Sequence, residues 1–312
     1  MDPDVSIIIV NYHTENLVID CVNSIRRQSD GIKYEIIIVD NGSIRDLKRS
    51  ELSEDFVALE KDENIRIIKL KENIGFGRAN NKGWNEAKGR NILFLNPDTL
   101  LLNNAIKILS DFLDSHSKTG ACGGNLYNIH FQPSYSHQRI FPGIKWEINE
   151  LLNHIPQKIF FGSNYRFNNR KSPLKVTAIS GADLMIKKKI LEASRGFDKD
   201  YFMYFEDTDI CKRIYDQGWE IFNVPFAKIQ HIESGSFQKE TYKPSEQKIK
   251  LFEESKKIYY SKNKSRTGCR ISKIIYYIFL TSRILLVKEK RKKDYYKIRK
   301  FYFLNGDKEV VV

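Results

Sequence analysis

Short runs of apolar and β-branched residues recur along the first third of the chain, and each ends at a polar stretch. The runs lie at Val5 to Val10, Glu35 to Val39, Ile65 to Leu70 and Ile92 to Leu95. Runs of this length between polar residues are typical of buried strands. Apolar residues also recur at helical spacing from Leu17 to Ile25, so a helix is expected there. Strands that alternate with helices predict an α/β fold with a mostly parallel sheet flanked by helices.

The fourth run continues into a polar turn that cannot belong to a central strand. Asn96-Pro97-Asp98 follows the run directly, and Pro97 has no N–H to donate to a ladder. In open α/β sheets, ligands bind outside the carboxyl ends of the strands. Asp98 is therefore a candidate residue of a metal or phosphate site. The alternative is that Asp98 only caps a helix predicted from Asn103 to Leu113.

Two other strands also end in polar residues. The first predicted strand is followed by Asn11 and Tyr12, and the second by Asp40, Asn41, Gly42 and Ser43. Parallel strands present their carboxyl ends at one edge of a sheet, so these residues are expected to converge with the turn that contains Asp98.

A glycine-containing segment from Asn73 to Asn81 lies between the third and fourth strands. Gly75 and Gly77 would let the backbone come close to a ligand, and Arg78 is placed to meet a diphosphate. The segment lacks the GxGxxG spacing of a dinucleotide site. A turn before a helix from Asn80 to Lys88 is the alternative interpretation.

A second acidic region follows a run of aromatic residues. Ser180-Gly181-Ala182-Asp183 lies within apolar flanks, and further along comes Tyr201 to Asp209, which contains Glu206 and Asp207. If Glu206 or Asp207 begins a helix, its charge lies near the positive helix end and partly out of water. Such a carboxylate can take a proton from a substrate hydroxyl. An acidic first helical turn with ordinary capping is the alternative.

The next predicted strand, Trp219 to Val224, is expected to end at Pro225, and His231 follows a few residues later. A histidine of this kind is either structural or a metal ligand. Four cysteines lie far apart without a CxxC pair, which excludes a typical zinc or redox motif and favours reduced thiols. With no leader before the first strand, the expected location is the cytoplasm.

The net charge of +13 is concentrated near the C-terminus. Residues 241–312 hold 20 Lys and Arg against 7 Asp and Glu, whereas 32 balance 32 in residues 1–240. Apolar residues and tyrosines from Ile271 to Leu286 lie between cationic flanks, as in a helix at a membrane interface. The alternative is a helix that packs on the catalytic domain. A nucleic-acid-binding role is disfavoured, because the body is neutral and no nucleic-acid module is present.

Seven of these stretches, in order, are similar to the family 2 glycosyltransferases with the GT-A fold, particularly a bacterial branch with rhamnosyltransferases of polysaccharide assembly. The resemblance covers residues 4–236. It implies a catalytic domain at 1–240 and a basic helical extension at 241–312. The matching stretches are 5–12, 38–43, 73–76 with 79–81, 96–98, 196–198, 204–209 and 224–231.

The resemblance implies transfer of a sugar from a nucleotide-sugar donor to a hydroxyl of a glycan acceptor, with inversion at the anomeric carbon. Asp207 would be the general base, with Glu206 as the alternative. Asp98 and His231 would hold Mg²⁺ or Mn²⁺ against the diphosphate. The donor would contact Asn11, Tyr12, Asp40, Asn41, Asn73, Gly75, Arg78, Asn80, Asn96 and Asp98.

The sequence departs from the family pattern at Asn96, where the common metal motif has Asp. A neutral oxygen ligand weakens binding of a hard cation. The Asn-Pro-Asp form occurs in the named branch and favours a deoxysugar donor such as dTDP-rhamnose over a UDP-hexose or UDP-N-acetylhexosamine. A non-catalytic sugar-nucleotide-binding subunit is a further alternative. The acceptor is expected to be lipid-linked, with the enzyme peripheral on the inner face of the cell membrane.

Overall fold

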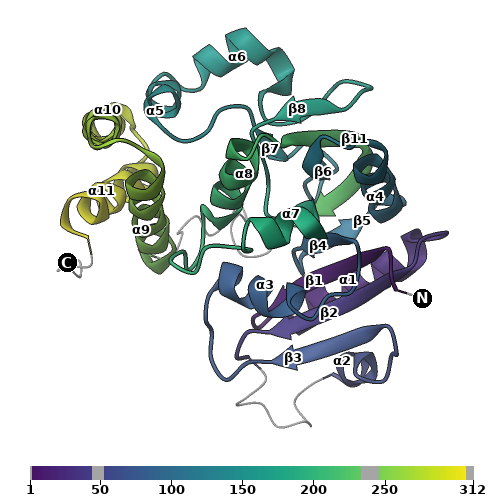
Figure 1. The fold of residues 1–312 in the computed structure, drawn as a ribbon. Coiled ribbons are helices and arrows are strands. Elements are labelled where there is room, and N and C mark those ends of the chain that lie inside the picture. The colour runs from purple at the N-terminus through teal and green to yellow at the C-terminus, as the bar shows by residue number, and fades with distance from the viewer. Residues whose placement is uncertain (1, 44–52, 233–245, 307–312) are drawn as a thin grey trace. The chain divides into compact units, whose positions relative to one another are not determined.

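A computed structural model describes residues 2–43, 53–232 and 246–306 (Figure 1). The chain divides into two compact units. The first takes in the described residues of 1–139, 163–199 and 206–232, and the second those of 140–162, 200–205 and 233–312. The boundary expected at residue 240 lies outside the described residues.

The first unit is built on a mixed sheet that has nine strands within the described residues. The strand order is β3-β2-β1-β4-β10-β6-β11-β5, and β8 pairs with β11. A separate pair, β7 with β9, forms a small second sheet. The strands are β1 (Val5–Asn11), β2 (Tyr34–Asp40), β3 (Ile65–Lys69), β4 (Asn91–Leu95), β5 (Thr99–Leu101), β6 (Thr119–Tyr127), β7 (His137–Gln138), β8 (Leu174–Val176), β9 (Ala178–Ile179), β10 (Asp183–Lys187) and β11 (Glu220–His231).

The four strands expected near the N-terminus pair in parallel, which confirms the predicted α/β fold (Figure 1). All of β1 and β4 is buried, because each lies inside the sheet between two other strands and is covered by helices. β10 then runs antiparallel to both β4 and β6, so its residues reach the carboxyl end of β4 from the opposite direction.

Six helices of the described residues flank this sheet. The helix α3 begins at Phe76 and ends at Trp84, earlier than the expected 80 to 88, because Gly75 with φ of 89° ends the preceding turn. The helix after the fourth strand begins at Ala105 with Asn104 at its N-cap, so Asp98 does not cap it. The six are α1 (Glu15–Gln28), α2 (Glu54–Leu59), α3 (Phe76–Trp84), α4 (Ala105–Ser115), α7 (Lys188–Ala193) and α8 (Glu206–Asp216).

The expectation that Pro225 ends a strand is wrong. β11 continues through Pro225 to His231, with a register shift against β6 between Asn223 and Lys228. Proline is tolerated where a ladder is interrupted by such an irregularity, because no N–H is required there. The continued strand carries His231 to the turn that contains Asp98.

The second unit is mainly helical. α9 packs against the aromatic residues Tyr201 and Phe205, and α10 packs against α5 and α11. The segment from Asn128 to Lys175, which has no clear period in the sequence, contains α5 and α6. No described helix is both long and apolar enough to cross a membrane. The helices of this unit are α5 (Ile144–Leu151), α6 (Ile155–Phe161), α9 (Glu246–Asn263), α10 (Arg266–Leu286) and α11 (Lys290–Asn305). A short 3₁₀ turn, Gly162–Tyr165, follows α6 where the chain passes back into the first unit.

Candidate active site

The ends of β1 and β2 are joined by a buried polar network. Asn11 and Asp40 lie opposite each other in the register and are both fully buried. The Asn11 amide donates to Oδ1 of Asp40 (2.9 Å), and the Ser43 hydroxyl donates to the same oxygen. The ring of Tyr12 is 46% exposed beside this network. Asn11 at the end of β1, Tyr12 directly after it and Asp40 at the end of β2 are therefore together at the sheet edge.

The loops after β2 and β3 are joined in the same way. The Asn41 amide donates to Oδ1 of Asn73 (2.8 Å), while Oδ1 of Asn41 accepts from the Ile74 N–H (3.0 Å). The Gly75 N–H also donates to Oδ1 of Asn73 (2.9 Å), and its positive φ suits glycine. These bonds hold Asn41, Asn73 and Gly75 in one fixed turn.

The remaining residues of the glycine segment make contacts within the protein. A Cβ at Gly77 would lie 3.1 Å from Cβ of Phe197 and 3.5 Å from Cβ of Glu206, so glycine permits close packing here. Arg78 donates from Nε to the Lys199 carbonyl (2.6 Å). Asn80 is buried and donates to the Phe76 carbonyl (3.1 Å). Contacts of Arg78 and Asn80 with a donor stay predictions.

The turn after β4 lies beside His231. Oδ1 of Asp98 is 3.3 Å from Nε2 of His231, and Nδ2 of Asn96 is 3.5 Å from the same nitrogen. The pairing of β5 with β11 places His231 opposite Thr99, which explains how residues so distant in sequence meet. Oδ1 of Asn96 is buried without a hydrogen-bond partner. The structure thus brings together the three residues expected near a cation.

This donor set fits a divalent cation of the Mg²⁺ or Mn²⁺ type. A carboxylate, an imidazole and a buried amide oxygen with an unused lone pair are ligand types that such ions accept. Among the described residues, no group of three or more His, Cys, Asp and Glu side chains could hold a metal ion. The protein therefore offers two strong ligands and one neutral oxygen, and a bound ion would need the remaining ligands from a diphosphate or water.

Asp183 is a further candidate site residue, which sequence reasoning did not single out. It lies opposite Leu95 in the pairing of β10 with β4 and is fully buried. The Gly124 N–H donates to Oδ2 (2.5 Å), while Oδ1 has no hydrogen-bond partner. Burial raises the pKa of Asp183 to about 7, against the opposing effect of the nearby His231. Its only signal in the sequence is a carboxylate inside an apolar run.

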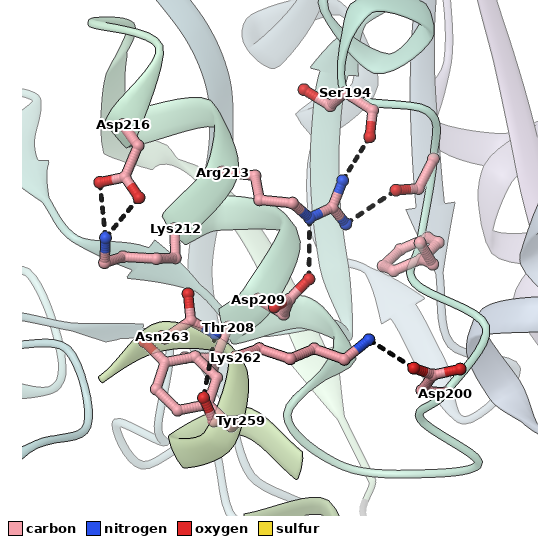
Figure 2. A network of polar contacts seen from close by, with 12 residues as sticks. Ser194, Asp200, Thr208, Asp209, Lys212, Arg213, Asp216, Tyr259, Lys262 and Asn263 are labelled. Atoms are coloured by element: carbon pink, nitrogen blue, oxygen red, sulfur yellow. Dashed lines mark hydrogen bonds and ion pairs between the residues drawn. The ribbon is translucent and has the colours of Figure 1, made fainter. Parts of the chain in front are cut away.

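The three carboxylates at the start of α8 have different partners. Asp209 accepts from Nε of Arg213 (2.8 Å), and Arg213 also donates to the carbonyls of Ser194 and Gly196 (Figure 2). Asp209 is thus neutralised, and with Arg213 it fixes the loop that contains Gly196.

Glu206 and Asp207 form no ion pair within the described residues. Oδ2 of Asp207 accepts from the Gly181 N–H (2.9 Å), and Oδ1 accepts from the Thr208 N–H (2.6 Å). Glu206 is buried, and its Oε2 has no hydrogen-bond partner. Burial raises the pKa of both groups, and with the nearby Asp207 charge it raises the pKa of Glu206 to about 8. Negative charge on the pair is better stabilised on Asp207 than on Glu206, because the N–H groups of Gly181 and Thr208 both donate to the Asp207 carboxylate.

One short backbone segment connects the cation residues to this acidic pair. The Asn96 N–H donates to the Ala182 carbonyl (3.0 Å), and the adjacent Gly181 donates to Asp207. A Cβ at Gly181 would lie 3.3 Å from Cβ of Asp207, which shows how close the two segments are. The two acidic regions of the sequence therefore belong to one site.

Comparison with known families identifies the family to which this chain belongs. A family model described as Glycosyl transferase family 2 matches residues 6–194. The chain belongs to glycosyl transferase family 2. The matched range includes the residues of β1, β2 and the turn with Asp98, and it ends before Glu206.

Two curated proteins are similar in sequence to part of this family 2 chain. It is 24% identical over 209 residues to the N-acetylglucosaminyl-diphospho-decaprenol L-rhamnosyltransferase of Mycobacterium tuberculosis, covering 63% of the chain and 66% of that protein. It is 26% identical over 240 residues to the uncharacterized protein y4gI of Sinorhizobium fredii, covering 75% of the chain and 25% of that protein. The chain thus spans a quarter of one relative and just under two thirds of the other.

A solved structure confirms the expected GT-A fold. The crystal structure of GalNAc-T7 with UDP, GalNAc and Mn²⁺ matches with a TM-score of 0.62 at 14% identity. The match covers 98% of this family 2 chain and 56% of that chain. The fold and the family expected from the motifs are confirmed, and the family model supports the expected class of glycosyltransferases.

Proposed function

We propose that this glycosyltransferase moves a sugar from a nucleotide-sugar donor to a hydroxyl of a glycan acceptor, with inversion. The observation that carries the proposal is the segment Gly181 to Asp183. It bonds to Asp207 through Gly181 and to the turn after β4 through Ala182. A proton acceptor and a set of cation ligands therefore lie on two sides of one backbone segment, as transfer from a diphosphate to a hydroxyl requires.

The donor lies along the carboxyl ends of β1, β2 and β4. Asn11 and Tyr12 contact the base, and Asp40 binds the base or the ribose. Two observations support these assignments: the Asn11–Asp40 hydrogen bond is buried, and Tyr12 beside it is exposed. The turn made by Asn41, Asn73 and Gly75 borders the same edge, and Arg78, Asn80 and Asn96 complete this proposed donor site.

Asp98 and His231 hold the cation, and the amide oxygen of Asn96 is a third ligand. A divalent cation there supplies positive charge against the leaving diphosphate. The close approach of Asp98 to His231 and the unused Asn96 oxygen support this assignment.

Asp207 is the general base, and Glu206 is the alternative. Asp207 is half-buried, whereas Glu206 is buried, so Asp207 is the more accessible of the two. It removes the proton from the acceptor hydroxyl as the oxygen attacks from the face opposite the leaving group. One base suffices because no covalent intermediate forms. A protonated Glu206 beside it avoids a second negative charge.

The acceptor is a lipid-linked glycan, and a deoxysugar such as rhamnose is the favoured donor sugar. The name of the mycobacterial relative supports both assignments. A UDP-hexose or UDP-N-acetylhexosamine is the alternative donor.

The enzyme contacts the inner face of the cell membrane through α10. Ile274, Ile278, Leu285 and Leu286 are exposed on this helix, and the segment Lys288 to Lys293 that follows it is strongly basic. Apolar and cationic side chains in this combination bind an interface with anionic lipid.

A thermal-shift screen tests the proposed donor site. Purified protein is heated with dTDP, UDP, GDP or CDP, each with and without Mn²⁺, because a ligand of the native state raises the melting temperature. We expect a Mn²⁺-dependent rise with dTDP above all. A larger rise with UDP would select the alternative donor, and no rise with any nucleotide would contradict the proposed site.

A non-catalytic sugar-nucleotide-binding subunit is the second candidate, favoured by the neutral Asn96 in the cation site. Such a protein would show the thermal shift but neither transfer nor hydrolysis of the matching nucleotide sugar. Activity assays with the nucleotide sugar chosen by the screen separate the two.

A further inference from the structure

The residues directly before the acidic pair belong to the second unit. Asp200 to Phe205 group with the C-terminal helices, while Glu206 begins α8 of the first unit. This short segment is therefore joined directly, through the backbone, to the helix that carries Asp207.

Two consecutive aromatic residues of this segment have left-handed backbone conformations. The φ angles are 71° at Tyr204 and 65° at Phe205. Bulky residues rarely adopt this conformation, because Cβ comes too close to the following carbonyl oxygen. Strained backbone of this kind persists only where the surrounding structure imposes it, and it is frequent beside active sites.

One face of α9 supplies the contacts that hold the segment. The hydroxyl of Ser255, which is 2% exposed, donates to the Met203 carbonyl (2.6 Å). The ring of Phe252 lies 5.3 Å from that of Phe205 and 5.8 Å from that of Tyr204.

Two further residues of α9 extend this face. Tyr259 lies 5.6 Å from the Phe205 ring, and Lys262 forms an ion pair with Asp200 (2.6 Å; Figure 2). Steps of three and four residues from Phe252 to Lys262 place all four side chains on one side of the helix. The hydrogen bond, the ring contacts and the ion pair thus all hold the strained segment from Asp200 to Phe205.

We infer that α9 is a positioning element of the active site, in which Phe252, Ser255 and Tyr259 hold Met203 to Phe205 in the conformation that directs Asp207 toward its substrate. The inference rests on the proposed function, because it takes Asp207 as the base. Ser255 and its neighbours touch no substrate. They act through the backbone that precedes α8, so the C-terminal extension serves catalysis as well as any membrane contact.

The variant Ser255→Ala removes the hydrogen bond to Met203 and leaves the ring contacts in place. Small displacements of a catalytic group lower turnover steeply. We expect kcat to fall about tenfold while KM for the donor stays within about twofold, since the proposed donor site is elsewhere. Ser255→Thr keeps the hydroxyl and is expected to restore most of the turnover.

Ser261→Ala is the matched control on the same helix. Its hydroxyl donates to the Ile258 carbonyl (2.8 Å) within α9 and makes no bond to the segment before α8. It should change neither kcat nor KM. If Ser255→Ala does not fold, Phe252→Leu removes the ring contacts and keeps an apolar side chain, and the same fall in kcat is expected.

Limited digestion with chymotrypsin gives a readout that is independent of activity. Chymotrypsin cuts after aromatic residues, and the segment from Tyr201 to Phe205 contains four of them. Release of the segment in Ser255→Ala should speed cleavage between residues 201 and 206, while Ser261→Ala should be cut at the wild-type rate.

The outcomes separate this inference from the proposed function. Faster cleavage together with lower kcat in Ser255→Ala supports positioning. Unchanged cleavage shows that the hydrogen bond does not hold the segment, and faster cleavage with wild-type kcat shows a structural role only; either result overturns the inference. Wild-type turnover in Asp207→Asn would instead overturn the base itself, and the positioning role with it.

Discussion

Two pairs of carboxylates in the protein lie wholly or partly out of water, and their surroundings are opposite. Glu206 and Asp207 of the first unit have no ion pair within the described residues. In the second unit, Glu147 and Glu253 are each 1% exposed, and each is paired with a cationic side chain. Lys256 lies 2.7 Å from Oε1 of Glu147, and Nε of Arg299 lies 2.7 Å from Oε1 of Glu253.

Tyrosines complete the second pair. The Tyr260 hydroxyl donates to Glu147 (2.5 Å), the Tyr276 hydroxyl donates to Glu253, and the Lys256 ammonium lies 3.1 Å from the centre of the Tyr276 ring. These residues come from α5, α9, α10 and α11, so the network joins four helices of the second unit.

The difference shows that burial alone does not mark a reactive carboxylate. A buried carboxylate with its own cation is held in the charged form and serves structure. A buried carboxylate without one has a raised pKa and can exchange a proton near neutral pH. The same contrast exists within α8 itself, because Asp209, two residues after Asp207, is paired with Arg213.

The largest expected effect is on turnover in Asp207→Asn. Asparagine keeps the shape and an oxygen to accept from Gly181 but cannot take a proton, so kcat should fall by about 10² to 10⁴. Steady-state kinetics measure kcat, and the melting temperature checks the fold. Asp216→Asn, in which an exposed carboxylate on the same helix loses its pairing with Lys212, should keep full turnover. Equal losses of kcat in both variants would contradict the distinction between carboxylates with and without a paired cation.

Next in size is the effect of Glu253→Gln on stability. The change leaves the Arg299 guanidinium buried without its counter-charge, which costs about 3 to 5 kcal/mol of unfolding free energy. Urea unfolding measures the loss. The control is Glu289→Gln, which removes a pairing with Lys292 between two half-exposed side chains and should cost less than about 1 kcal/mol. A loss below 1 kcal/mol in Glu253→Gln would place Glu253 with the unpaired carboxylates instead.

The effect of Glu206→Gln on stability should be opposite in sign to that of Glu253→Gln. Because the pKa of Glu206 is raised from 4.5 to about 8 in the fold, its contribution is complete below pH 4.5 and is lost as the pH rises to about 8. The loss is roughly 1.4 kcal/mol for each unit of the pKa shift. Glutamine imitates the neutral form, so the variant should lose less stability than wild type between pH 4.5 and 8.

Unfolding at several pH values in this range checks the prediction. Asp183 remains in both proteins, and its raised pKa adds a similar slope to each. The difference between the two curves therefore reports Glu206 together with its effect on the neighbouring Asp207. Parallel curves would mean that Glu206 is ionised in the fold at neutral pH.

Part of this site could be predicted from the sequence because its signals are local. Continuous apolar runs such as Ile7 to Val10 indicate buried strands, and the polar residues after them indicate the sheet edge. The pairing of Asp209, which distinguishes it from Asp207, could also be predicted locally. Arg213 follows Asp209 by four residues, a spacing that places the two on one helix face.

The parts that sequence reasoning missed depend on contacts between distant segments. Asp183 enters the site only because β10 runs antiparallel beside β4, and no pattern near Asp183 specifies that partner. The strand through Pro225 depends in the same way on the irregular pairing of β11 with β6. The hydrogen bond from Ser255 to Met203 joins segments that share no sequence signal.

Asp98 is a third kind of carboxylate, half-buried beside an imidazole, and its replacement has the smallest expected effect. Asp98→Asn should lower the affinity for Mn²⁺ about ten- to a hundredfold, since a neutral amide binds a hard cation more weakly than a carboxylate does. The measurement is the Mn²⁺-dependent part of the thermal shift with the best nucleotide. Asp216→Asn is again the control and should keep the full shift. If Asp98→Asn also keeps it at low Mn²⁺, the cation is held elsewhere, and Asp98 belongs with the structural carboxylates as a partner of His231.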